Sequence, residues 1–272
     1  MTSGAVILMY HSVARDDEAR FVEPGNHIAP RLFERQMAFL RQARRVVPLS
    51  RLVDDIAAGK SPPAGTVCIT FDDGYRDNLT IAAPILDRYR LPATLFLATG
   101  FVERAENQWS DTLHRLPLAT GLKKRLHRQL LDASQGERMR VLAEFQVEEK
   151  PRLMLDWDEA RRLCRRYPLF EIGGHTREHL DLTKHQVEAR AQIEGCAADL
   201  RRELGVEPQH FSYPYGRSCA ETRRAVIGAG WRCAVVTDAA PPRVGPATDR
   251  YAMPRVQAPR SVIGLAFKLG FS

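Results

Sequence analysis

Two adjacent aspartates are the first side chains in this sequence that could do chemistry. Asp72 and Asp73 come directly after the apolar run Thr66–Phe71 and before Gly74. Adjacent carboxylates at the end of a buried strand are costly unless they are paired, so they indicate a bound cation or an active site. An Asp-Asp-Gly triplet is also a good turn sequence, and the triplet alone leaves both interpretations open.

Two histidines four residues apart offer ligands for such a cation. His175 and His179 follow the apolar run Phe170–Ile172 and two glycines. If the chain turns into a helix at His175, His179 lies one turn later on the same face, and both imidazoles reach one ion. One carboxylate and two histidines leave an open position for water, as a catalytic zinc site requires. The ion would supply a nucleophile at neutral pH, and the second aspartate would act as general base.

The same histidines also fit a metalloprotease signature. The segment from His175 to His179 reads H-x-x-E-H, with Glu178 as the base. That motif belongs in the middle of a helix, whereas here it follows two glycines at the end of an expected strand. It also leaves the two aspartates unexplained, so a metalloprotease is the weaker hypothesis.

Two further segments place polar groups at the end of an expected strand. HFSYPYG, residues 210–216, ends in a rigid turn that could aim a backbone N–H at a developing oxyanion, and it also suits a plain strand–turn joint. His11 follows the run Ala5–Tyr10 and therefore belongs to the same edge. A lone histidine there is a candidate catalytic or substrate-binding residue, or a structural hydrogen-bonding one.

Short β-branched strands alternate with amphipathic helices along the chain. Helical patterns cover Leu32–Arg44, Asn78–Arg90 and Thr183–Leu204, the last with Thr183 as its cap and an end at Gly205. The alternation implies parallel βαβ units, and about seven strands favour a distorted (β/α) barrel in the α/β class. The expected strands are Ala5–Tyr10, Thr66–Phe71, Thr94–Leu97, Phe170–Ile172, His210–Tyr213, Cys233–Val236 and Ala252–Val256.

Residues 103–166 interrupt this alternation. They form a long polar stretch with leucines near helical spacing, which predicts a helical insertion packed on the barrel rim. No internal repeat or low-complexity linker is visible, so we expect a single domain over residues 1–272. The leucines are Leu113, Leu116, Leu122, Leu126 and Leu130.

The composition is that of an ordinary globular enzyme. The chain has 272 residues, of which 44% are hydrophobic and 27% charged, and a formal net charge of +7. Five cysteines, an odd number without a C-x-x-C motif, indicate reduced thiols in a cytoplasmic compartment. The N-terminus, MTSGAVILMYHSV, has neither a basic start nor a long apolar run, so we expect no signal peptide and no membrane span.

Basic residues cluster in and after the insertion. The clusters are Lys123-Lys124-Arg125, Arg161-Arg162 and Arg165-Arg166. Such clusters can face nucleic acid, an anionic membrane or an acidic glycan, although most exposed charge is only solvated. Neither an aromatic RNA motif nor zinc-finger spacing accompanies them, so we expect no nucleic-acid partner. Nothing in the sequence indicates an oligomeric state.

Taken together, these motifs resemble the polysaccharide deacetylases of the NodB-homology type, carbohydrate esterase family 4. The resemblance runs from LMYHSV through TFDDGY, GGHTREH and FSYPYG to YAMPRV, and it is similar to the YPYG-type branch. It implies a distorted (β/α) barrel and metal-dependent hydrolysis of an N-acetyl group from an acetamido sugar, with release of acetate. The metal would be Zn²⁺, with Co²⁺ or Ni²⁺ able to replace it. The matching residues are Asp72 as base, Asp73, His175 and His179 as metal ligands, and Tyr215, whose backbone N–H would help hold the oxyanion.

Two features depart from the family pattern. Many members carry an arginine that pairs with the catalytic aspartate where this chain has Ser212, and Arg255 is the candidate for that guanidinium. A C-terminal catalytic histidine is not recognisable after Val256. His11 is therefore the candidate for the general acid or for substrate binding.

The resemblance implies an N-acetylated glycan as substrate, either a polysaccharide or a lipid- or nucleotide-linked precursor of cell-envelope polysaccharide. A precursor would suit a cytoplasmic enzyme whose basic insertion faces an anionic membrane surface or a pyrophosphate-linked sugar. The departures also fit a second hypothesis, a non-catalytic glycan-binding relative that keeps the barrel and has lost turnover.

Overall fold

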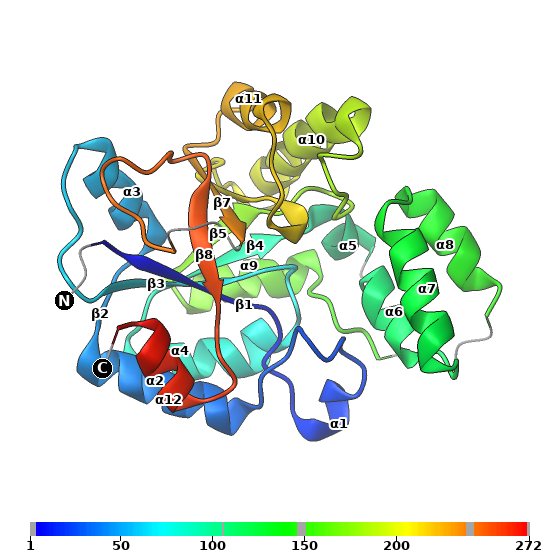
Figure 1. Ribbon diagram of the computed structural model, residues 1–272, viewed down its shortest axis with the longest axis horizontal. Coiled ribbons are helices and arrows are strands. Elements are labelled where there is room, and N and C mark those ends of the chain that lie inside the picture. The colour runs from blue at the N-terminus through cyan, green and yellow to red at the C-terminus, as the bar shows by residue number, and fades with distance from the viewer. Residues whose placement is uncertain (1–3, 105, 146–150, 238–241, 271–272) are drawn as a thin grey trace.

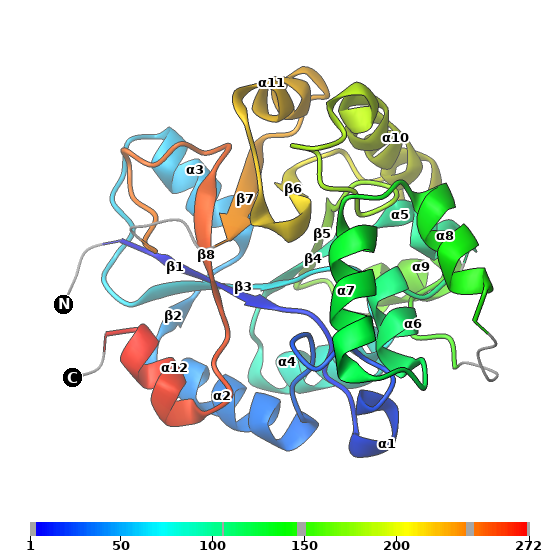
Figure 2. The ribbon, with the colours of Figure 1, turned by 45° about the vertical axis from the view of Figure 1, so that its right-hand side comes forward.

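Seven parallel strands form a closed barrel at the centre of the molecule (Figures 1 and 2). The computed structural model describes residues 4–104, 106–145, 151–237 and 242–270. The short strand β2 (Arg45–Val46) pairs with the start of β3 outside this ring. The closed ring confirms the predicted distorted (β/α) barrel of about seven strands. In order around it lie β1 (Val6–Tyr10), β3 (Thr66–Phe71), β4 (Ala93–Leu97), β5 (Phe170–Gly174), β6 (His210–Ser212), β7 (Cys233–Thr237) and β8 (Met253–Gln257), which pairs again with β1.

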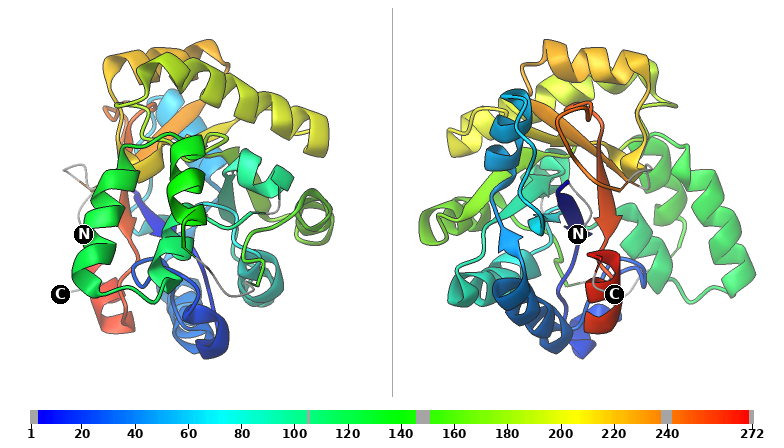
Figure 3. Two further views of the ribbon diagram at one scale, coloured as in Figure 1. Left: turned by 90° about the vertical axis from the view of Figure 1, so that its right-hand side faces the viewer. Right: turned by 60° about the vertical axis from the view of Figure 1, so that its left-hand side comes forward.

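Helices surround the ring on most sides (Figure 3). On one side α2 (Pro30–Ala43) packs against α4 (Ala83–Tyr89) and α12 (Val262–Lys268). On the opposite side α10 (Gln186–Leu204) packs against α11 (Ala220–Gly228). The remaining helices of the barrel layer are α1 (Asp16–Ala19), α3 (Leu49–Ala57), α5 (Thr99–Arg104) and α9 (Trp157–Arg166).

Two of the predicted helices differ from the structure at their starts. The pattern Asn78–Arg90 begins with a π-helical turn, Asn78–Ala82, before α4. The predicted Thr183 cap is wrong, because α10 begins at Gln186 and Thr183 instead donates its hydroxyl to Asp181 Oδ1 at 2.6 Å. The Thr183 hydroxyl is therefore used in a local side-chain hydrogen bond to Asp181, which competes with capping of the helix. Gly205 ends α10 in the left-handed conformation, as predicted.

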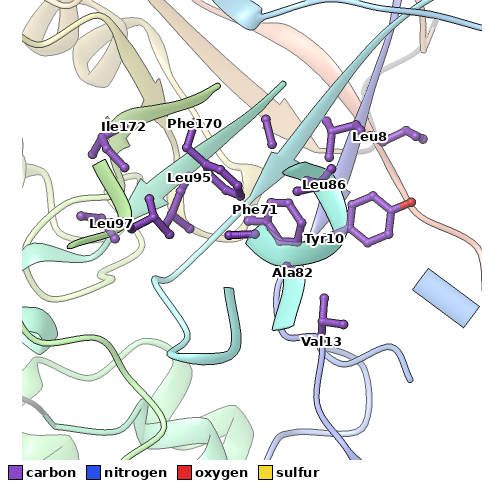
Figure 4. Close-up of a cluster of buried hydrophobic side chains, with 14 of the residues drawn as sticks. Leu8, Tyr10, Val13, Phe71, Ala82, Leu86, Leu95, Leu97, Phe170 and Ile172 are labelled. Atoms are coloured by element: carbon purple, nitrogen blue, oxygen red, sulfur yellow. The ribbon is translucent and has the colours of Figure 1, made fainter. Parts of the chain in front are cut away.

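Alternate residues of β3 face opposite sides of the barrel wall. Ile69 and Phe71 join the hydrophobic layer under the helices, where Phe71 stacks on Tyr10 with 5.5 Å between the ring centroids (Figure 4). Cys68 belongs to the separate cluster inside the barrel. The period of two therefore carries Asp72 inward, where it is only 2% exposed. The ordinary alternation of side chains along a strand thus places the Asp72 carboxylate inside the barrel.

Three helices of the predicted insertion stand together beside the barrel (Figures 1 and 2). They are α6 (Trp109–Arg115), α7 (Thr120–Leu131) and α8 (Gln135–Ala143), and we call them the helical unit. Their small hydrophobic core contains four of the five leucines that the sequence pattern marked, and the fifth, Leu122, is partly buried and packs against it. α9, at the end of the predicted insertion, instead packs against β5 and α10 and belongs to the barrel layer.

The five cysteines are all free thiols, in agreement with the absence of a disulfide pattern in the sequence. Within the described ranges, no helix combines the length and the apolar character needed to cross a membrane.

Candidate active site

A cavity of about 400 Å³ opens where the barrel strands end. The carboxyl ends of parallel strands meet at one edge of a barrel, so polar residues far apart in the sequence converge there. Arg255 lies behind the cavity wall and is hydrogen-bonded to Asp72. The other six residues singled out in the sequence line the cavity: His11, Asp72, Asp73, His175, His179 and Tyr215.

Asp73, His175 and His179 form a group with the geometry to hold a metal ion. Their ligand atoms all lie within 4.8 Å of one another. Asp73 Oδ1 is 3.5 Å from Nε2 of each histidine, and no described residue donates a hydrogen bond to this buried oxygen. An unsatisfied buried carboxylate oxygen between two imidazoles is costly, and a divalent cation would satisfy all three groups. The residues therefore fit a metal.

The charge states of this group also suit a cation. Burial lowers the pKa of His175, and burial followed by repulsion from His175 and Arg138 holds the pKa of His179 well below its ordinary value. Both imidazoles are therefore neutral near pH 7, the form that binds metals. Burial, and then the charge of Asp72, raise the pKa of Asp73 well above its ordinary value. A bound cation would reverse that effect.

The two histidines lie on an irregular loop, so the predicted helix at His175 is wrong. Thr176 and His179 have positive φ angles of 63° and 48°, which no α-helix contains. The loop nevertheless brings the two rings to 4.7 Å between centroids. His175 Nδ1 is 2.7 Å from the carbonyl oxygen of Ser212, so Nδ1–H donates there and Nε2 faces Asp73.

Unusual backbone conformations concentrate in this site. Five described non-glycine residues have positive φ, and four of them are Asp73, Thr176, His179 and Tyr215. The fifth, Arg90, ends a helix in the left-handed conformation. Positive φ costs a β-branched or bulky residue free energy, which the surrounding structure must supply. The fold therefore holds the ligand loop and the Tyr215 turn under strain.

The two glycines before His175 are required by close packing on both faces of β5. A Cβ on Gly173 would lie 2.5 Å from the His210 carbonyl oxygen and 2.6 Å from the Phe96 ring. A Cβ on Gly174 would lie 2.4 Å from the Trp231 ring. The glycines thus fix the position of the strand that delivers the histidine loop.

Asp72 is held by a fully buried arginine. Arg255 Nη1 and Nη2 donate to the two carboxylate oxygens of Asp72, each at 2.6 Å. Arg255 Nη2 also donates to Ser212 Oγ at 2.8 Å, and Nη1 donates to Thr70 Oγ1 at 3.2 Å. Burial alone would raise the pKa of Asp72, but Arg255, and then His175, hold it below its ordinary value. Asp72 is thus an ionised carboxylate beside the metal-ligand group.

Tyr215 sits in the 3-10 turn Pro214–Gly216 with a φ of 57°. The two hydrogen bonds of the turn are donated by the N–H groups of Gly216 and Arg217, so neither uses the N–H of Tyr215. The Tyr215 ring packs edge-on against His179, with 4.7 Å between centroids. Its backbone and its ring therefore both border the metal-ligand group.

Arg138 of α8 is a site residue that the sequence analysis missed. Its guanidinium is fully buried and donates to the carbonyl oxygen of His179 at 3.3 Å and to the hydroxyl of Tyr215 at 3.4 Å. It also donates to the Leu130 and Leu131 carbonyls at 2.9 and 3.0 Å. Among the described residues no carboxylate forms an ion pair with it.

The remaining predicted groups fall in different places. Burial lowers the pKa of His11 to about 4, so this imidazole is neutral near pH 7, and its Nδ1 has no hydrogen-bond partner in the part of the chain that the structure describes. Glu178 turns away from the cavity and pairs with Arg104 through hydrogen bonds of 3.0 and 2.8 Å. With its glutamate engaged elsewhere and its histidines off a helix, the H-x-x-E-H segment lacks the geometry of a metalloprotease.

Comparison with known proteins gives a consistent result. A family model described as polysaccharide deacetylase matches residues 59–234. "Putative polysaccharide deacetylase YxkH" of Bacillus subtilis (strain 168) is 24% identical over 267 residues, which cover 96% of this chain and 74% of that protein. Two solved structures share the fold. The deacetylase PplD of Streptococcus pyogenes, in complex with acetate, has a TM-score of 0.70 and 18% identity over 98% of each chain. IcaB from Ammonifex degensii has a TM-score of 0.70 and 22% identity, covering 99% of this chain and 98% of that one.

Proposed function

The chain belongs to the polysaccharide deacetylase family, and on this premise we propose that it removes an N-acetyl group from an acetamido sugar by metal-dependent hydrolysis. The observation that carries the proposal is the position of the Arg255-held carboxylate of Asp72 beside the group formed by Asp73, His175 and His179. A base next to a metal site is the pairing that metal-dependent amide hydrolysis uses.

Asp73, His175 and His179 are the proposed metal ligands, and Zn²⁺ suits one carboxylate and two neutral imidazoles, with Co²⁺ or Ni²⁺ as substitutes. A bound divalent ion supplies Lewis acidity, which activates water at neutral pH and polarises the acetamide carbonyl. His175 is prepared for this role by its Nδ1 hydrogen bond to Ser212, which leaves Nε2 free to bind.

In the proposed reaction Asp72 accepts a proton from water as the water oxygen bonds to the acetamide carbon. Arg255 keeps Asp72 ionised and fixes the direction of its carboxylate. The Tyr215 N–H, which its turn leaves unused, donates to the developing oxyanion. The carbon–nitrogen bond then breaks, acetate forms, and the proton held by Asp72 passes to the leaving nitrogen, which becomes a free amine.

His11 is proposed to bind substrate rather than to act as the general acid. A general acid must carry a proton to donate, and a pKa of about 4 leaves His11 without the extra proton near pH 7. A neutral imidazole facing the cavity with an unpaired Nδ1 can instead form a hydrogen bond with a sugar hydroxyl or the acetamide.

The proposed substrate is an N-acetylated glycan or a lipid- or nucleotide-linked precursor of one, acted on in the cytoplasm, with the basic helical unit facing a membrane surface or a linked anionic group. The free thiols are consistent with a reducing compartment.

The proposal is tested by measuring acetate release from acetylated oligosaccharides with metal-depleted protein and after adding back Zn²⁺, Co²⁺ or Ni²⁺. We expect release only with metal. Tight metal and glycan binding without acetate release from any acetylated glycan would overturn it and favour the non-catalytic glycan-binding hypothesis.

A further inference from the structure

A second cavity of about 470 Å³ opens beside the candidate active site. It is formed by α6 and α7 of the helical unit together with the loop at Glu23. Glu23, Ser110 and His127 line both this cavity and the catalytic one, so the two cavities are adjacent. Its volume is in the range of ligand pockets and suffices for part of a glycan that extends from the acetamide. We call this cavity the α7 arm.

The α7 arm carries unneutralised positive charge. Lys123, Lys124 and Arg128 line it, and among the described residues Glu23 is its one lining carboxylate. Glu23 lies 3.7 Å from Nε2 of His127, and Lys123 donates to the His114 carbonyl oxygen at 2.6 Å. Across the described part of the chain, neither Lys124 nor Arg128 takes part in an ion pair. Cations gathered in a cavity raise the local concentration of anions.

Some exposed arginines of this protein have carboxylate partners. Arg161 of α9 pairs with Asp158 at 2.8 Å and with Glu203 at 2.9 Å, and Arg202 pairs with Asp199 at 2.9 Å. Lys124 and Arg128 have no such partner among the described residues, and both line the cavity beside the candidate active site.

The lining also argues against a neutral sugar as the main occupant. Sugar faces and nucleobases pack on aromatic rings, yet the residues that line the α7 arm include no Phe, Tyr or Trp side chain. What the arm presents instead is three long basic side chains, two histidines and Ser110. This is a surface for charge-assisted hydrogen bonds to phosphate or carboxylate oxygens.

We propose that the α7 arm binds an acidic group of the substrate, a phosphate, a pyrophosphate or a sugar carboxylate, while the acetamide lies at the metal-ligand group. The inference rests on the proposed function and narrows it to acidic acetamido glycans or anionic sugar precursors. Lys124 and Arg128 are the residues assigned to the anion.

The test compares acidic and neutral substrates on metal-loaded protein. The neutral probe is an N-acetylchitooligosaccharide, the carboxylate probe is a hyaluronan oligosaccharide of equal length, and the phosphate probes are N-acetylglucosamine 1-phosphate and UDP-N-acetylglucosamine. We expect at least one acidic probe to show a higher kcat/KM than the neutral one. In Lys124→Gln and Arg128→Gln the acidic-to-neutral ratio should fall about tenfold, the size typical of one lost charge pair.

Arg125→Gln is the matched control, because Arg125 is an exposed cation of the same helix that does not line the arm. It should keep the wild-type ratio. A wild-type protein that prefers the neutral probe, or a ratio unchanged in both arm variants, would overturn the proposal.

Equilibrium binding separates this inference from the proposed function. If wild-type protein releases no acetate from any probe, the proposed function fails, but titration calorimetry of the same acidic probes still tests the α7 arm. Binding that weakens about tenfold in Lys124→Gln and Arg128→Gln but not in Arg125→Gln would support the anion site. Equal binding by all four proteins, or none, would contradict it.

Discussion

Arg255 and Asp72 meet inside the barrel through two hydrogen bonds of 2.6 Å, one to each carboxylate oxygen. Asp72 follows β3, whereas Arg255 lies on β8, and β1 separates the two strands in the ring. Ser212 of β6 also contacts both residues. The guanidinium therefore reaches the carboxylate across the barrel interior. Ser212 provides no positive charge for Asp72, but its hydroxyl hydrogen-bonds to both members of the pair.

Replacing Arg255 with alanine should damage both stability and activity. The change leaves Asp72 buried without its cation, which costs about 3–5 kcal/mol of unfolding free energy. It also frees the carboxylate to rotate and raises its pKa, so kcat/KM should fall by at least about 100-fold. Urea denaturation and acetate-release kinetics measure the two effects. Arg255→Lys keeps the charge but not the paired hydrogen bonds. Its unfolding free energy and its kcat/KM should therefore lie between those of the wild type and of Arg255→Ala. Full activity in Arg255→Ala would show that Asp72 does not depend on this arginine.

Variants of the two aspartates should differ, because Asp72 is the proposed base and Asp73 the proposed metal ligand. Asp72→Asn removes the proton acceptor but leaves Asp73 and the histidines in place, so kcat should fall by about 100-fold to 10,000-fold while bound metal persists. Asp73→Asn should instead lose metal. Metal analysis of the purified variants alongside kinetics distinguishes these outcomes.

Glu178→Gln is the natural control for this pair, because Glu178 is engaged with Arg104 outside the cavity. Its activity should stay within about threefold of wild type, since surface ion pairs contribute little. A large loss in Glu178→Gln together with an active Asp72→Asn would reverse the assignment of the base.

Arg138→Met should weaken metal binding although it replaces none of the proposed metal ligands. The substitution removes the hydrogen bonds from the guanidinium to the carbonyl of His179 and to the hydroxyl of Tyr215. Loss of such outer contacts typically lowers metal affinity about 10-fold to 100-fold. A competition titration with a chromophoric chelator gives the affinity, and Arg138→Lys should recover part of it. Unchanged affinity in a folded Arg138→Met would show that the loop holds its geometry without this arginine.

His11 should make the metal-free protein less stable as the pH falls. Burial lowers the pKa of His11 from 6.5 to about 4. Below pH 6.5 the unfolded chain therefore binds a proton at His11, whereas the folded chain binds it only below about pH 4. This contribution is absent above pH 6.5 and grows by about 1.4 kcal/mol for each pH unit below it. His11→Gln should therefore lose less unfolding free energy than wild type between pH 7 and pH 4.5, measured by urea denaturation with a chelator. Parallel stability curves would show that His11 titrates alike in both states.

The strands could be predicted because their local pattern and their environment agree. β3 was expected at Thr66–Phe71 and has those bounds, since a buried parallel strand reads as an unbroken apolar run. That agreement placed Asp72 and Asp73 at the strand end. The closure of β8 onto β1 then follows from the number of strands rather than from any single residue.

The conformation of the histidine segment could not be predicted from its spacing. A separation of four residues suits a helix, but Thr176 adopts a positive φ, which a β-branched residue rarely does and which no local pattern announces. Arg138 was missed for a related reason, because its contacts depend on how the helical unit packs against the barrel. The one local signal is its place a turn before Leu142, on the buried face of α8.

The buried guanidinium of Arg138 has a consequence for how this protein could be re-engineered. The helical unit has its own hydrophobic core, which is a property expected of a module that is exchangeable between barrels. Arg138 of this unit, however, donates a hydrogen bond to the carbonyl oxygen of His179, one of the proposed metal ligands. A transplant of α6–α8 would therefore have to keep Arg138. The recipient barrel would need a loop with a carbonyl oxygen placed to accept its hydrogen bond. In a barrel without such a loop, the buried guanidinium of Arg138 would lose the acceptor that the carbonyl of His179 provides here.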